Sequence, residues 1–212
     1  MLFRSFFAQD RTLVYTDVDA TRSNLRSLNT RNARMLHIAS HGYFQSSDPD
    51  NIGFALSPSN VAGRADSGFV TLTELFSYRF NNELVVISGC DSALGLDRGG
   101  EGMLSLTRGF IAQGASHVVS SLWPVSDRAS AEFMTRFYES LVANGSVARA
   151  LRDAQLELRS RPEYANPWFW APYILTSVAP ESRMTFPERR APARAARAHR
   201  SLRVSRPSRQ MT

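Results

Sequence analysis

Several residue types that would point to particular functions are scarce in this 212-residue chain. Its one cysteine, Cys90, cannot form an internal disulfide, which favours a reducing compartment, the cytoplasm. Lysine is absent, which we attribute to codon usage rather than to a binding role, and the glycine-rich stretch 95–102 lacks the Lys-Ser/Thr pair of a P-loop. No apolar run approaches the roughly 20 residues of a membrane span, and no signal-peptide core precedes residue 10. We therefore expect a cytoplasmic protein with no membrane partner.

The net charge of +6 is unevenly distributed. Residues 179–212 hold nine of the 25 arginines but two of the 19 acidic residues, so residues 1–178 are nearly neutral. The tail is rich in Arg, Ala, Pro and Ser, which is typical of disorder. No aromatic residue follows Phe186 to stack on bases, so we do not expect nucleic-acid binding. The sequence thus predicts one folded domain, 1–178, and a basic disordered tail, 179–212.

Apolar runs and helical periodicities alternate along the domain. Runs at 34–40, 84–87, 117–123 and 170–176 predict strands, whereas 21–28, 71–76, 103–113, 128–144 and 146–161 predict helices. Residues 43–70 are loop-like, with at most a short edge strand at 54–56. Such alternation requires right-handed crossovers and indicates an α/β fold, a three-layer αβα sandwich with a mostly parallel sheet.

Cys90 follows the apolar run 84–87 directly after small residues. Reactive groups of open parallel sheets collect beyond the carboxyl ends of the strands, so an accessible thiol there is a candidate nucleophile. A lone cysteine is, alternatively, a small buried hydrophobe. The position alone leaves both interpretations open.

Two histidines belong to the earlier run at 34–40 and its exit. On an extended strand His37 and His41 lie about 13 Å apart at about 3.3 Å per residue, too far to share an ion, so we expect no metal and no cofactor. His37 is mid-strand and is interpreted as a hydrogen-bonded core histidine. His41, at the strand exit beside Gly42, is the better candidate base for Cys90.

Three ordered blocks carry a resemblance to a known family: His-Ile-Ala-Ser-His-Gly at 37–42, Ile-Ser-Gly-Cys-Asp-Ser at 87–92 and Ser-Leu-Trp-Pro-Val-Ser-Asp at 121–127. They resemble the CHAT family of caspase-like, separase-related cysteine peptidase domains, often attached to tetratricopeptide repeats. The resemblance runs from about residue 20 to 176, and the segment before it is shorter than is usual in the family. It implies a caspase-like fold, a His41–Cys90 dyad and a tetratricopeptide-repeat regulatory partner.

The same resemblance suggests roles for three further residues. Gly42 N–H would join Cys90 N–H in an oxyanion hole, although a glycine there could instead serve a turn with positive φ. Asp127 corresponds to the acidic residue that receives a P1 arginine in separase, but an Asp before a helix is more commonly an N-cap. Asp91 could be the pocket acid instead, or a turn residue.

Two functional hypotheses follow. One is a cysteine endopeptidase that cleaves a protein or peptide substrate after Arg, controlled by a partner. The other is a catalytically silent caspase-like interaction module. The first requires the strands at 34–40 and 83–89 to be parallel neighbours, so that His41 and Cys90 reach the same edge of the sheet.

Overall fold

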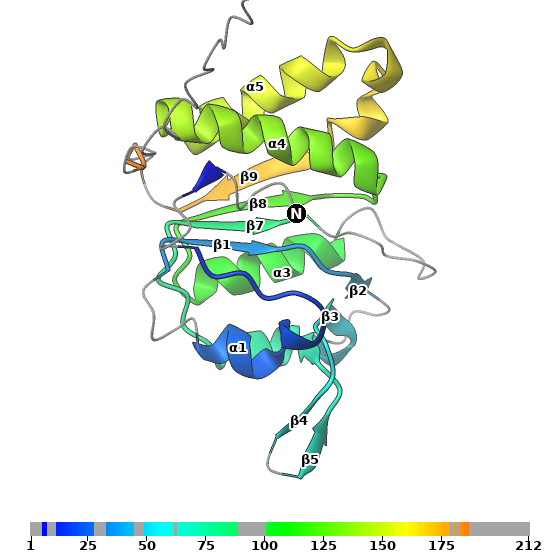
Figure 1. Ribbon diagram of the computed structural model, residues 1–212, viewed down its shortest axis with the longest axis vertical. Helices are drawn as coiled ribbons and strands as arrows, with labels where there is room; N and C mark the ends of the chain where they lie inside the picture. Colours follow the sequence, from blue (N-terminus) through cyan, green and yellow to red (C-terminus); the bar gives the residue numbers. More distant parts are fainter. Residues whose placement is uncertain are drawn as a thin grey trace, which may run out of the picture.

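A four-stranded sheet with the order β1-β7-β8-β9 forms the centre of the domain (Figure 1). The structure, a computed structural model, describes residues 6–7, 12–27, 33–44, 49–61, 63–88, 101–178, 180 and 183–186, without the side chains of 44, 49, 61 and 101–105. β1 (Met35–Ile38), β7 (Leu84–Ile87) and β8 (His117–Ser121) are parallel, and β9 (Tyr173–Ser177) is antiparallel to β8. The predicted mostly parallel α/β sheet is therefore confirmed.

Helices cover both faces of this sheet (Figure 1). α4 (Asp127–Asn144) and α5 (Val147–Arg159) pack on one face, in a core that includes Leu84, Val86 and Val119. α3 (Glu101–Ala112), α1 (Arg22–Ser27) and α2 (Leu72–Leu75) lie on the other, whose core includes Val85, Ile87 and Val118. All four residues of β7 are buried because both faces are covered, which explains its uninterrupted apolar sequence. That the layers are those of a caspase-like fold stays a prediction.

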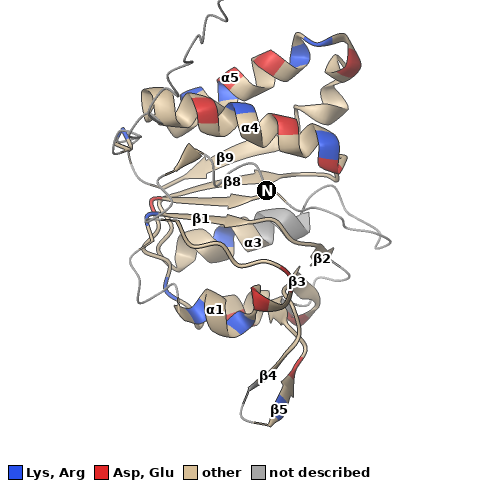
Figure 2. Ribbon diagram, viewed as in Figure 1, with Lys and Arg blue, Asp and Glu red and all other residues tan. Residues whose placement is uncertain are grey.

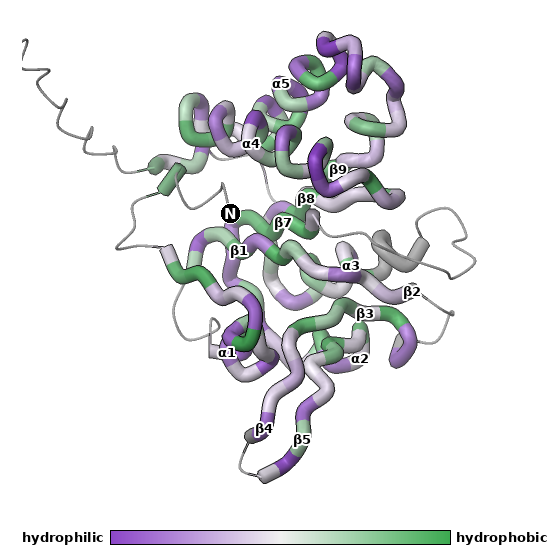
Figure 3. The backbone as a smooth tube through the Cα atoms, turned by 45° about the vertical axis from the view of Figure 1, so that its right-hand side comes forward, coloured by the Kyte–Doolittle hydropathy of each residue, from purple (hydrophilic) through white to green (hydrophobic). Residues whose placement is uncertain are grey.

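Residues 43–70 are more regular than their loop-like composition predicts. β2 (Gly42–Phe44), β3 (Ile52–Ala55) and β6 (Phe69–Thr71) form an antiparallel sheet in the order β2-β3-β6. The hairpin of β4 (Ser59–Val61) and β5 (Arg64–Asp66) projects from the domain, as Figures 1 and 3 both show. The short strand predicted at 54–56 overlaps β3, which is the central strand of this sheet rather than an edge strand. The other strands were not predicted because they are only three residues long and carry little periodicity.

The helix ends differ from the predictions at two residues. Ser126, not Asp127, caps α4, because its side chain accepts from the N–H of Ala129; Asp127 is the first helical residue. Phe76, included in the helix predicted at 71–76, lies beyond the last residue of α2, Leu75, and is 51% exposed. The helix predicted at 146–161 is confirmed as α5, whose inward face consists of five buried residues at helical spacing: Val147, Ala150, Leu151, Ala154 and Leu158.

The segment beyond Pro180 makes contacts that the tail prediction did not include. Met184 is 4% exposed and its N–H donates to the carbonyl of Gly145 at 2.8 Å. The Thr185 carbonyl accepts from Arg34 at 2.8 Å, and the Phe186 ring lies 5.8 Å from that of Phe7. Residues 183–186 therefore pack against the folded domain, in contrast to the disordered tail expected from residue 179 onward. Residues 187–212 lie outside the described part of the chain.

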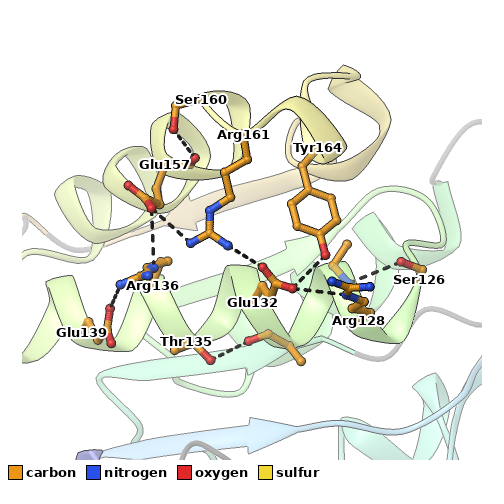
Figure 4. A network of polar contacts seen from close by, with 12 residues as sticks. Ser126, Arg128, Glu132, Thr135, Arg136, Glu139, Glu157, Ser160, Arg161 and Tyr164 are labelled. Carbon is orange, nitrogen blue, oxygen red and sulfur yellow. Dashed lines mark hydrogen bonds and ion pairs between the residues drawn. The ribbon is translucent and has the colours of Figure 1, made fainter.

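Charged side chains gather on the helices, whereas the four strands of the central sheet carry none (Figure 2). Glu132 of α4 accepts from Arg161 at 2.5 Å and from the Tyr164 hydroxyl at 2.8 Å (Figure 4). Arg161 also contacts Glu157 of α5 at 3.1 Å, so one arginine links the two helices. None of the helices in the described residues is both long enough and apolar enough to span a bilayer. Within the described ranges, 3₁₀ turns also lie at Asp17–Asp19, Pro49–Asn51, Pro162–Tyr164 and Pro167–Phe169.

Candidate functional site

Three parallel strands end in line at one edge of the central sheet. The register pairs Ile38 of β1 with Ile87 of β7, and Ile87 with Ser120 of β8. His41 comes three residues after Ile38, and Cys90 three residues after Ile87. The expectation that these strands are parallel neighbours is thus confirmed, and the segments that bear both residues leave the sheet from the same edge.

His41 lies where the chain passes from the central sheet into the small one. Its carbonyl accepts from the N–H of Ala55 at 2.9 Å, and the hydroxyl of Ser40 donates to the carbonyl of Ala55. Ala55 therefore contacts both the side chain of Ser40 and the main chain of His41. His41 itself is exposed, and its carbonyl is held by the N–H of Ala55.

Gly42 begins β2 and is buried, facing Phe54 of β3. Since Ala55 N–H bonds to the carbonyl of His41, Gly42 and Phe54 form the non-hydrogen-bonded kind of antiparallel pair. The N–H of Gly42 is therefore directed away from β3. The alternative of a turn with positive φ is wrong, because Gly42 is in a strand and is not among the glycines with positive φ.

The nucleophile candidate itself lies outside the described residues, as does Asp91. The last residue described before them is Ser88, whose N–H donates to the carbonyl of Ile38 at 3.0 Å. The pairing of β7 with β1 therefore continues at least one residue beyond β7, to within two residues of Cys90.

Asp127 follows β8, the third strand that ends at this edge. Its carboxylate is exposed in the first turn of α4. The loop between β8 and α4 packs against the turn at Pro167–Phe169: the Trp123 ring lies 5.5 Å from that of Trp168, and its indole N–H donates to the Trp168 carbonyl at 3.1 Å. This contact fixes the loop that leads to Asp127.

No group of three or more His, Cys, Asp and Glu side chains in the described ranges has the geometry of a metal site. The comparison with known families decides what kind of domain this is, since the CHAT domain family matches residues 2–177. The chain is a member of the CHAT domain family. The family resemblance found in the three sequence blocks is thereby confirmed.

Two curated relatives of this CHAT domain are tetratricopeptide repeat protein 28 of Mus musculus and of Homo sapiens. The mouse protein is 34% identical over 106 residues, which cover 50% of this chain and 4% of the relative. The human protein is 39% identical over 75 residues, which cover 35% of this chain and 3% of the relative. The chain thus matches only a small part of two much longer proteins.

The sequence did not reveal one polar cluster beside the site in the CHAT domain. Nε2 of His37 lies 2.6 Å from the hydroxyl of Ser88, and Nδ1 lies 2.9 Å from the hydroxyl of Tyr138 in α4. Removal of the imidazole from water lowers the pKa of His37 to about 4. The interpretation of His37 as a hydrogen-bonded histidine is confirmed, but the residue is half-buried rather than fully within the core. A buried tyrosine needs a partner for its hydroxyl, but the spacing of residues 37 and 138 does not identify one.

Proposed function

We propose that this CHAT domain is a caspase-like cysteine endopeptidase that uses His41 and Cys90 as a dyad. The observation that carries the proposal is the register of β1 and β7, which aligns Ile38 with Ile87. The two candidate residues follow these positions at equal distances along the chain. A base and a nucleophile on adjacent parallel strands are a geometry suited to proton transfer between them.

In the proposed reaction the Cys90 thiolate attacks the carbonyl carbon of the scissile peptide bond and forms a tetrahedral intermediate. The C–N bond then breaks, and the imidazolium of His41 gives its proton to the leaving amine. Water, deprotonated by His41, attacks the resulting thioester. The carboxylic acid product leaves and the thiol is restored, so atoms and protons balance over the cycle.

Gly42 is proposed to stabilise the oxyanion of the tetrahedral intermediate together with the N–H of Cys90. The pairing pattern supports this role because β3 does not use the N–H of Gly42. Glycine also lets a substrate carbonyl approach the main chain closely. The rigid attachment of this strand to Ala55 would keep the donor in place during the reaction.

Asp127 is proposed as the acceptor for an arginine at P1, with Asp91 as the alternative pocket acid. A carboxylate binds a guanidinium in a bidentate manner, which lysine cannot reproduce. Asp127 is exposed and belongs to the segment that leaves the same sheet edge as His41, which supports the assignment. Since an exposed ion pair contributes little, the preference depends on the substrate covering the carboxylate when it binds.

A tetratricopeptide-repeat regulatory partner is the proposed source of control. The two relatives are named tetratricopeptide repeat proteins, and the matched region is a small part of each. A cytoplasmic location, proposed from the single cysteine, would suit such a partner.

Alkylation of the single cysteine tests the dyad without knowledge of the substrate. Iodoacetamide should label Cys90 readily near neutral pH, because His41 lowers the pKa of the thiol. The His41→Ala variant should move the midpoint of the labelling rate against pH upward, and Cys90→Ala should abolish both labelling and cleavage of peptides. A folded wild type whose Cys90 has an ordinary midpoint, unaffected by His41→Ala, would leave only the silent interaction module.

A further inference from the structure

Three side chains from separate elements form a continuous chain of hydrogen bonds next to the proposed dyad. Tyr138 comes from α4, His37 from β1, and Ser88 from the residue that follows β7. The Tyr138 hydroxyl lies 2.9 Å from Nδ1 of His37, and Nε2 lies 2.6 Å from the Ser88 hydroxyl. The chain thus crosses from a helix to two adjacent strands.

At any moment the two hydrogen bonds of this series are donated in the same direction, either from Tyr138 toward Ser88 or from Ser88 toward Tyr138. A neutral imidazole carries one N–H donor and one acceptor nitrogen, and burial, which lowers the pKa of His37 to about 4, keeps the ring neutral at physiological pH. Burial also raises the pKa of the Tyr138 phenol, so this group is neutral too. Each contact therefore pairs a donor with an acceptor, and rotation of the imidazole would break both.

The tyrosine ring at the start of the chain is held by packing. Its centroid lies 5.2 Å from that of Phe137 and 5.5 Å from that of Phe7, both edge to face, and 6.4 Å from that of Phe6. Tyr138 is 2% exposed. A ring fixed on several sides presents its hydroxyl in one place, which in turn fixes His37.

Ser88 is bound to β1 through both its main chain and its side chain. Its N–H donates to the carbonyl of Ile38 at 3.0 Å, and its hydroxyl contacts the ring of His37 at 2.6 Å. Other positions of β1 and β7 are apolar, so this polar contact is not what drives the burial of the strands. Polar contacts in a core are better at selecting one arrangement than at adding stability.

We propose that His37 is a positioning residue, which ties Ser88 to Tyr138, fixes the exit of β7 relative to β1, and so presents Cys90 to His41. The second half of this inference rests on the proposed function, because it needs the dyad. The first half concerns only the strand exit and stands without catalysis. Ser88 precedes Cys90 by two residues, so a rotation at Ser88 changes the direction in which the chain continues.

The test compares four variants of the full chain. Ser88→Ala removes the hydroxyl that His37 contacts, Ser88→Thr retains a hydroxyl, and Tyr138→Phe removes the far end of the chain while keeping the ring. Ser120→Ala is the control, because it removes a buried hydroxyl contact of 3.1 Å to Thr107 on the opposite face of the sheet. The melting temperature of each of the four variants shows whether a change in exchange or alkylation merely reflects a loss of overall stability.

Two readouts separate the two halves of the inference. Amide hydrogen exchange at position 88 reports the strand exit: it should be at least tenfold faster in Ser88→Ala and near wild type in Ser88→Thr and Ser120→Ala. The midpoint of Cys90 alkylation against pH reports the dyad. It should shift upward, toward that of His41→Ala, in Ser88→Ala and less in Tyr138→Phe, whereas Ser88→Thr and Ser120→Ala should keep the wild-type midpoint.

Unchanged exchange in Ser88→Ala overturns the inference entirely. Faster exchange with an unchanged alkylation midpoint, in a protein whose midpoint does respond to His41→Ala, overturns the role toward Cys90. If the midpoint responds neither to Ser88→Ala nor to His41→Ala, the proposed function fails. In that case, amide exchange at position 88 that is faster in Ser88→Ala and near wild type in Ser88→Thr still supports the first half of the inference, that His37 fixes the end of β7 relative to β1.

Discussion

Gly145 and Met184 are packed main chain against main chain. The N–H of Met184 donates to the carbonyl of Gly145 at 2.8 Å, and a Cβ on Gly145 would collide with the carbonyl oxygen of Met184. Gly145 ends α4 with a φ of 73°, a conformation that glycine adopts without strain. One glycine therefore terminates the helix and receives the segment at 183–186.

Gly145→Ala should destabilise the protein more than a glycine substitution that involves conformation alone. Gly63 is the matched control, since its φ is 79° but a Cβ there would meet nothing within 4 Å. Gly63→Ala should cost about 1 kcal/mol of unfolding free energy from the left-handed backbone. Gly145→Ala should cost about 2 kcal/mol or more, because the segment that carries buried Met184 must also move. If urea denaturation gives the same loss of unfolding free energy for Gly145→Ala and Gly63→Ala, the segment at 183–186 can move away without destabilising the protein.

The lowered pKa of His37 predicts how stability varies with pH. The folded state binds fewer protons than the unfolded state between the folded pKa of about 4 and the ordinary value of 6.5. The free energy of unfolding is therefore highest, with respect to His37, above pH 6.5. It decreases as the pH falls toward 4, by up to about 3 kcal/mol. Tyr138, the titratable partner of the ring, stays neutral in this range because burial raises its pKa.

Urea denaturation of wild type and His37→Gln at several pH values between 4 and 7 measures this contribution. Glutamine cannot titrate, so the variant should lose less stability on acidification, whatever its stability at pH 7. His41 and His117 are present in both proteins and cancel in the difference. Parallel curves for the two proteins would contradict the assignment of a neutral, enclosed imidazole.

Substitutions at Ser126 and Asp127 should distinguish the residue that caps α4 from the residue proposed to bind the P1 arginine. Ser126→Ala removes the acceptor for the N–H of Ala129 and should cost about 1 kcal/mol of stability. Asp127→Asn should cost only a few tenths of a kcal/mol, from the helix dipole. In a positional-scanning peptide library Asp127→Asn should lose the preference for Arg at P1, while Ser126→Ala keeps it. If Asp127→Asn keeps the preference for Arg at P1, Asp127 is not the acid that binds the arginine, and Asp91 becomes the candidate.

The contact between Glu132 and Arg161 should show measurable coupling (Figure 4). The side chains of Glu132 and Arg161 are 30% and 25% exposed. The pKa of Glu132 is lowered mainly by its hydrogen bond to Tyr164, and also by its contacts with Arg128 and Arg161. A double-mutant cycle with Glu132→Gln and Arg161→Gln should give about 1 kcal/mol, reduced by 1 M salt. The wider pair Arg149–Asp153, at 3.8 Å and more exposed, should give close to zero. Equal coupling in the two cycles would contradict the special role of Glu132.

The parts of the fold that the sequence predicts are those with strong local signals. β7 is an unbroken apolar run because it is buried on both faces, and α5 shows five inward residues at helical spacing. The small sheet was missed because its strands are short and pair with partners that the local sequence does not specify. Met184 and Phe186 are isolated apolar residues in a polar segment, so composition alone assigned them to a disordered tail.

The candidate site was predictable only at the level of the sheet edge. The strand at 34–40 and the strand before Cys90 were predicted to be parallel neighbours, and β1 and β7 are, so that their carboxyl ends meet at one edge of the sheet. The cap was assigned to Asp127 rather than Ser126 because both residue types cap helices and the helix start was uncertain by one residue. The Tyr138–His37 contact joins residues 101 positions apart, a separation that no local pattern reports.

The contact of Phe7 with Phe186 has a consequence for modularity. The segments at Phe7 and Phe186 come from opposite ends of the described part of the sequence, and their ring centroids lie 5.8 Å apart. Neighbouring entry and exit points are the condition under which a domain is inserted into a host loop without spreading that loop apart.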